Sequence, residues 1–111
     1  MRIEKYINLT VQSLFIWTFK MGRFWTDEEV KGKILHKLTR LGKFKHSHTS
    51  INNLPKGFPK DVWGRVKGMV KELKRERILF SKPTSYGEEV SVNVEMNEKI
   101  MFYICRFLEG N

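Results

Sequence analysis

One apolar repeat constrains the fold of this chain more than any other feature of its sequence. Five apolar residues recur at intervals of three and four positions: Val62, Val66, Met69, Val70 and Leu73. This spacing places them on one side of an α-helix. Because Pro59 suits the first turn of a helix, we expect an amphipathic helix over residues 59–77. Its apolar stripe must be buried against other elements of a small core.

The preceding segment predicts a second helix, which begins after Thr26 and ends at Gly42. Thr26 and Glu29 have the spacing of a capping box. Four apolar residues then fall within a narrow arc of the helix: Val30, Ile34, Leu38 and Leu41. Between the two helices, residues 46–59 are polar and contain a short apolar element around Ile51 and Leu54, for which we expect a short helix followed by a turn.

After residue 77 the pattern changes to strand. Residues 78–82 and 89–94 flank a turn-rich stretch, residues 83–87, which predicts a two-stranded hairpin. Residues 95–108 then have a helical pattern. Residues 4–21 favour a helix, although the alternation of Ile7, Leu9 and Val11 leaves a strand open.

The order helix, short helix, turn, helix and hairpin is that of a winged helix-turn-helix. We therefore expect a mainly α fold with a small β-hairpin and extra N- and C-terminal helices, forming a single domain over residues 1–111. Its winged-helix core would span residues 22–94. Residues 1–21 and 95–111 would form flanking helices that dimerise.

The charge of the chain is concentrated in its middle. The net charge is +9, and fifteen of the 21 basic residues but only three of the 12 acidic residues lie within residues 30–82. That stretch therefore carries a balance of +12, and the rest of the chain −3. A surplus confined to one region indicates a binding face for a polyanion rather than a general solubility charge.

The expected contacts to nucleic acid follow from a helical wheel of residues 59–77. Lysines suit phosphates, and the arginines can also read guanine. Gly64 and Gly68 lower helix stability, which is consistent either with close packing of a neighbouring helix or with a close approach to a ligand. The candidate DNA-binding residues are Lys33, Lys37, Lys43, Lys45, Lys60, Gly64, Arg65, Lys67, Lys71, Arg75, Lys82, Thr84, Ser85 and Tyr86.

The sequence offers little support for catalysis. His46, Ser47 and His48 lack the acidic or thiol partners of a metal site or a nucleophile, so we expect no catalytic residue, metal, cofactor or small-molecule ligand. The chain is therefore predicted not to be an enzyme. The single cysteine, Cys105, is expected to be buried and indicates a reducing compartment. With no apolar run of membrane-spanning length, a cytoplasmic location is expected.

A family resemblance covers about half of the chain. The residues that carry it are residues 48–60, Gly64, Val66, Lys67, residues 70–73, Ile78, Leu79, residues 82–87 and residues 90–93. In these residues the chain resembles small archaeal winged-helix proteins of the transcriptional-regulator type. The resemblance implies a DNA-binding fold, with the helix from Pro59 as the recognition helix and the hairpin over residues 78–94 as the wing.

These observations together predict a duplex DNA-binding protein, a transcriptional regulator. A protein-interaction module on the same scaffold and an RNA-binding protein are the alternatives. The terminal segments are apolar on more than one side, so a C2 homodimer is expected to cover the surplus apolar faces. Packing of the two terminal helices on each other within one chain is the other way to cover them.

Overall fold

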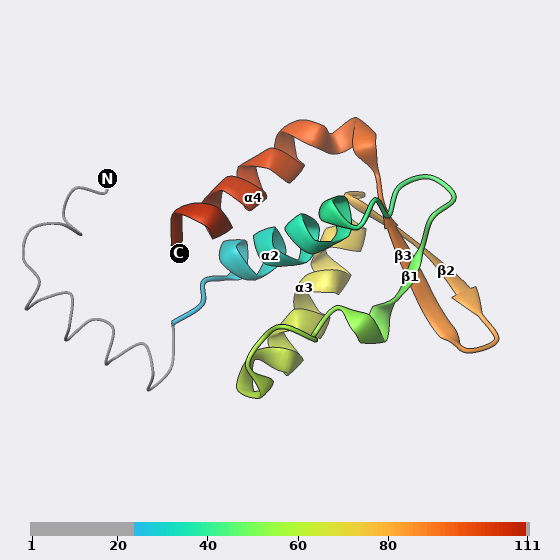
Figure 1. Cartoon of the computed structure of the whole chain (residues 1–111), viewed down its shortest axis with the longest axis horizontal. Helices are drawn as coiled ribbons and strands as arrows, with labels where there is room; N and C mark the ends of the chain where they lie inside the picture. The colour runs from blue at the N-terminus through green and yellow to red at the C-terminus, as the bar shows by residue number, and fades with distance from the viewer. Residues whose placement is uncertain (1–23, 111) are drawn as a thin grey trace, which may run out of the picture.

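The computed structural model describes residues 24–110, which form three α-helices and a small antiparallel sheet (Figure 1). The helices are α2 (Asp27–Arg40), α3 (Trp63–Arg75) and α4 (Asn97–Gly110), and the strands are β1 (Thr49–Ser50), β2 (Leu79–Thr84) and β3 (Gly87–Val92). In the view of Figure 1, α2 lies between α4 and α3, and the β2–β3 hairpin projects beyond the helices. The expected helix over residues 4–21 lies outside the described residues.

Both ends of α2 follow the chemistry that its sequence predicts. The Thr26 hydroxyl accepts from the Glu29 backbone N–H, and the Glu29 carboxylate accepts from the Thr26 N–H, which completes the capping box. At the other end Gly42 has a φ of +71°, and the Lys43 N–H donates to the Leu38 carbonyl. This is the left-handed glycine cap that stops the helix where the sequence places its end.

The helix predicted over residues 59–77 is shorter than expected. Pro59 is extended, and Lys60–Val62 forms a 3₁₀ turn before α3 begins at Trp63. At its end Arg77 takes a φ of +65°, and the Ile78 N–H donates to the Leu73 carbonyl. A non-glycine residue therefore fills the left-handed capping position, and the chain leaves the helix two residues before the predicted end.

The short helix expected around Ile51 and Leu54 is reduced to one 3₁₀ turn, and an unexpected strand precedes it. The structure has the two-residue strand β1 followed by a single 3₁₀ turn, Ile51–Asn53. The residues of β1 pair with Val90 and Glu89 of β3. Pro55 then supplies no backbone donor with which a helix could continue.

The predicted hairpin is confirmed, but it belongs to a three-stranded sheet of order β1-β3-β2. The strand β2 is one residue longer and the turn is tighter than expected, because Thr84 already pairs with Gly87. The Thr84 hydroxyl accepts from the Tyr86 N–H and donates to the Gly87 carbonyl, which closes the turn. Pro83 is tolerated within β2 because β2 is an edge strand.

The terminal helix α4 packs on α2 and contributes to the same core. It starts after a 3₁₀ turn, Val94–Met96, so it is displaced by two residues from the predicted span. Its inner face buries Ile100, Tyr103, Ile104 and Phe107. The two helices approach closely at Gly32, where a Cβ would lie 2.0 Å from the Tyr103 carbonyl oxygen.

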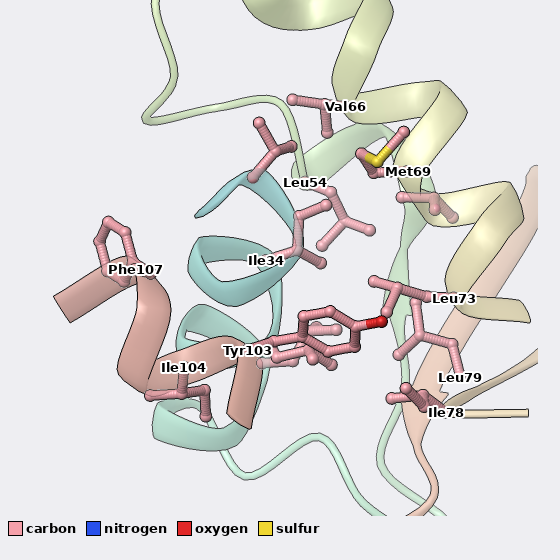
Figure 2. Close-up of a cluster of buried hydrophobic side chains, with 14 of the residues drawn as sticks. Ile34, Leu54, Val66, Met69, Leu73, Ile78, Leu79, Tyr103, Ile104 and Phe107 are labelled. Atoms are coloured by element: carbon pink, nitrogen blue, oxygen red, sulfur yellow. The ribbon is translucent and has the colours of Figure 1, made fainter. Parts of the chain in front are cut away.

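The core joins all three helices and the sheet. Figure 2 shows side chains from α2, α3, α4 and β2 converging, with Ile34 and Leu73 near the centre. Every member of the repeat that predicts α3, from Val62 to Leu73, is buried. The expected burial of Cys105 is wrong, because its side chain lies on the exposed side of α4. Within residues 24–110 no helix is both long and apolar enough to cross a membrane.

Candidate nucleic-acid interface

The outward face of α3 carries only basic residues and glycines. Opposite the buried stripe lie Gly64, Lys67, Gly68, Lys71 and Arg75, and Lys60 lies in the 3₁₀ turn just before the helix. All of these residues are exposed except Gly68, which is half-buried. Neither Lys67 nor Lys71 makes a hydrogen bond or ion pair with any residue that the structure describes. These cations are therefore available to an external anion.

Glu72 of α3 and Glu76, which directly follows it, face α2. Lys31 of α2 is buried, and its Nζ lies 2.6 Å from Glu76 Oε2 and 3.0 Å from Glu72 Oε1. The hydroxyl of Tyr103 donates to Glu76 Oε1 at 2.8 Å. This group of residues, the Lys31 cluster (Lys31, Glu72, Glu76 and Tyr103), joins the three helices. In it Glu72 and Glu76 pair with Lys31 and not with the cations of the outward face of α3.

In the Lys31 cluster, burial and hydrogen bonding shift the pKa values of Lys31 and Glu76 in opposite directions. Burial acts to lower the pKa of Lys31, but hydrogen bonds to Glu76 and Glu72 outweigh it and raise the pKa well above its ordinary value. Burial would likewise raise the pKa of Glu76, yet the bonds from Lys31 and Tyr103 hold it below the usual range. Burial and the bond to Glu76 raise the pKa of Tyr103. Lys31 and Glu76 are therefore an ion pair beside a neutral phenol at neutral pH.

Arg65, one of the two expected base readers, is held within the fold. Its Nη2 lies 2.6 Å from Asp27 Oδ1, and its Nη1 donates to the Trp25 carbonyl at 2.7 Å. These contacts direct its guanidinium toward the start of α2, away from the outward face of α3. Arg75 lies on the outward face, in line with Gly64 and Lys71, and is the arginine better placed to reach a ligand.

One ion pair links the hairpin to the side of α3. Lys74, on the flank of α3, pairs with Glu88 of β3, and the hydrogen bond from Lys74 lowers the pKa of that carboxyl. Lys82 is exposed and stands opposite Glu89 in the strand register. At the tip, Ser85 is exposed and Tyr86 is 93% exposed, so the tip is free to contact a partner.

The four candidate lysines of α2 and the segment after it do not join this face. Lys37 Nζ donates to the carbonyls of Asn53 and Lys56, at 2.6 and 3.1 Å. Lys33 Nζ lies over the rings of Trp25, Phe58 and Phe107. Lys43 and Lys45 follow α2 near the base of the sheet, where the Lys43 carbonyl accepts from the Val92 N–H.

The structure thus gathers four of the predicted residues on α3, namely Gly64, Lys67, Lys71 and Arg75. Lys60 lies in the 3₁₀ turn before α3, and Lys82, Thr84, Ser85 and Tyr86 lie on the hairpin. The sequence patterns described above give no role to Lys31. The sequence does indicate that Lys31 lies beside the apolar face of its helix, because it is only about 20° from Leu38 on a helical wheel, at the edge of the apolar arc. A lysine there must be buried or paired.

Comparisons of the chain with models of known families, with curated proteins and with solved structures give no match. Among residues 24–110 no group of three or more His, Cys, Asp or Glu side chains is placed to hold a metal ion.

Proposed function

We propose that this chain binds duplex DNA as a winged-helix transcriptional regulator, with α3 as the recognition helix and the β2–β3 hairpin as the wing. One observation carries the proposal: the outward face of α3 combines unpaired cations with glycines, while Glu72 and Glu76 pair with Lys31 of α2. A solvated lysine-rich surface normally intersperses both signs of charge. A face that carries only positive charge is instead suited to binding phosphates.

The order of the elements supports this assignment. A helix, a short strand, a helix and a hairpin follow one another in α2, β1, α3 and β2–β3. In winged-helix proteins the last of these helices enters the major groove, and its N-terminal part contacts the bases. Gly64 lies in that part and Lys60 in the turn just before it, whereas the exposed hairpin tip around Tyr86 would lie beside the phosphate backbone.

A salt titration with random-sequence duplex tests the proposal. The logarithm of the association constant should fall linearly with the logarithm of salt concentration, with a slope of roughly −0.9 for each neutralised phosphate and roughly 4 to 8 phosphates per dimer. Fluorescence anisotropy at each salt concentration measures the association constant. A flat response, or no affinity for random duplex, would favour a protein-interaction module. Preferential competition by RNA would favour an RNA-binding protein.

The two glycines of α3 provide a more specific test. A Cβ at Gly64 or Gly68 would meet nothing within 4 Å among the described residues, so packing inside the described fold does not require them. We expect Gly64→Ala to stabilise the fold by about 0.5–1 kcal/mol, because alanine is the better helix former. The same methyl group should weaken duplex binding, since it lies where the backbone would approach the groove.

Thermal melting and anisotropy measured on the same Gly64→Ala sample separate these two effects. An increase in melting temperature together with a loss of affinity is the expected pair of results. If the melting temperature rises and the affinity stays unchanged, the backbone of α3 does not approach the duplex at this point.

The outer face of α4 supports the proposal that the protein is a C2 homodimer. Met101, Phe102 and Leu108 are each about half exposed, at 52, 50 and 50%, and Cys105 lies among them. Packing of this face between two copies would cover it and set two recognition helices about 34 Å apart on a palindromic site. In sedimentation equilibrium at micromolar concentration we expect a dimer mass, and a monomer mass for Phe102→Glu. A wild-type monomer mass that persists as concentration rises would contradict the dimer.

A further inference from the structure

A second group of basic side chains surrounds a hollow of about 350 Å³ between α2, the segment before α3 and the end of α4. Its lining includes Lys33, His36, Lys37, Arg40, Lys56 and Phe107. None of the described residues that line it is acidic. We refer to this hollow as the α2 pocket.

The α2 pocket lies on the other side of α2 from α3. Lys31 faces α3, where it pairs with Glu72 and Glu76. Arg40 follows Lys31 by nine residues, which at about 100° per residue places it about 180° round the helix. The pocket and the outward face of α3 are therefore separate surfaces, with α2 between them.

The cations of the α2 pocket are held close together by the fold. Lys37 is fixed by its two bonds to the carbonyls of Asn53 and Lys56, and the Lys56 side chain donates to Asn53 Oδ1 at 3.3 Å. Burial, followed by repulsion from Lys56, Lys33 and Arg40, lowers the pKa of Lys37. An anion among these side chains would relieve that repulsion.

The aromatic side of the α2 pocket is already in place. Phe107 is buried and stacks with Trp25, and the Lys33 ammonium lies 5.5 Å from the centre of the Phe107 ring. His36 also contacts Phe107, with ring centroids 5.8 Å apart. The volume is in the range of small-molecule sites, roughly 300–1,000 Å³, and is too small to admit a duplex.

We propose that the α2 pocket binds a small phosphorylated molecule, with its phosphate among Lys37, Arg40 and Lys56 and the rest of the ligand against His36 and the edge of Phe107. Guanidinium and ammonium groups are the usual partners of phosphate, and several of them at one point favour a group with more than one negative charge. This inference goes beyond the proposed DNA binding and does not depend on it.

Titration with sodium pyrophosphate at constant ionic strength, followed by amide NMR, tests the α2 pocket. We expect saturable shifts that are largest at Lys37, Arg40, Lys56 and Gly57. The variant Arg40→Gln/Lys56→Gln should lower the affinity for pyrophosphate about tenfold or more, because two charged contacts are lost. Lys67→Gln/Lys71→Gln, which removes the same charge from α3, should change that affinity by less than about twofold.

Duplex binding by the same two variants distinguishes a small ligand from a DNA phosphate. Lys67→Gln/Lys71→Gln should weaken duplex binding, and Arg40→Gln/Lys56→Gln should leave it nearly unchanged. Equal losses of pyrophosphate affinity in the two variants, shifts that do not saturate, or a loss of duplex affinity in Arg40→Gln/Lys56→Gln would each overturn the proposal. Saturable pyrophosphate binding by a wild-type protein that binds no duplex would instead reject only the DNA-binding proposal.

Discussion

Reversing the charge of Lys67 and Lys71 together is expected to lower duplex affinity by about a hundredfold or more. The double variant Lys67→Glu/Lys71→Glu removes two cations from the outward face of α3 and places two anions against the phosphates. Since phosphate contacts carry no sequence information, the loss should be similar for specific and random duplexes. Fluorescence anisotropy at a fixed salt concentration measures it.

The control for this variant is Arg40→Glu/Lys56→Glu, which changes the net charge by the same amount on the other side of α2. Its loss of affinity should be much smaller, because only long-range attraction is reduced and salt screens that attraction. Thermal melts of both variants establish that each one is folded. Equal losses in the two double variants would mean that the net charge, and not the face of α3, determines binding.

Gly32→Ala is expected to destabilise the fold by about 3 kcal/mol or more, which corresponds to a decrease of roughly 12 °C or more in melting temperature for a domain of this size. The new Cβ would lie 2.0 Å from the Tyr103 carbonyl oxygen and 2.7 Å from Phe107 Cβ. Because the obstacle is backbone, α2 and α4 must move apart to admit the methyl group. Urea or thermal unfolding measures the change.

Gly64→Ala is the matched control, since it makes the same chemical change at a helical glycine with open space around it. The two substitutions should have opposite signs. A Gly32→Ala protein that melts within a degree or two of the wild type would show that α2 and α4 are not packed as closely as described.

Local patterns predicted the helices well, because each helix is specified by neighbours in the sequence. The capping box at Thr26 and Glu29 and the glycine cap at Gly42 lie at opposite ends of α2, and each is formed by residues close together in the sequence. The stripe ending at Leu73 fixed the buried face of α3, and with it the outward face that carries the proposed interface. This is the part of the candidate site that could be derived from periodicity alone.

Elements that depend on distant partners could not be predicted in this way. The strand β1 has two residues and exists only because β3 pairs with it, about 40 positions later in the chain. Lys31 pairs with Glu76, which is 45 residues away in the sequence, and Arg65 pairs with Asp27, which is 38 residues away. A helical wheel of α3 considers only the residues of that helix. It therefore predicted that Arg65 reads bases, because it could not include the contacts of Arg65 with Trp25 and Asp27 at the start of α2.

The Lys31 cluster also determines which parts of the molecule fluctuate together. Lys31 belongs to α2, Glu76 directly follows α3, and Tyr103 belongs to α4, so separating any one helix leaves buried polar groups without partners. Local opening of one helix is therefore costly, and the three should exchange their amide hydrogens as one cooperative unit. The hairpin tip beyond the ion pair of Lys74 and Glu88 is exposed around Tyr86, and we expect its amide hydrogens to exchange faster than those of the helices. The rigid and the adaptable parts of the proposed interface would then be different segments of the chain.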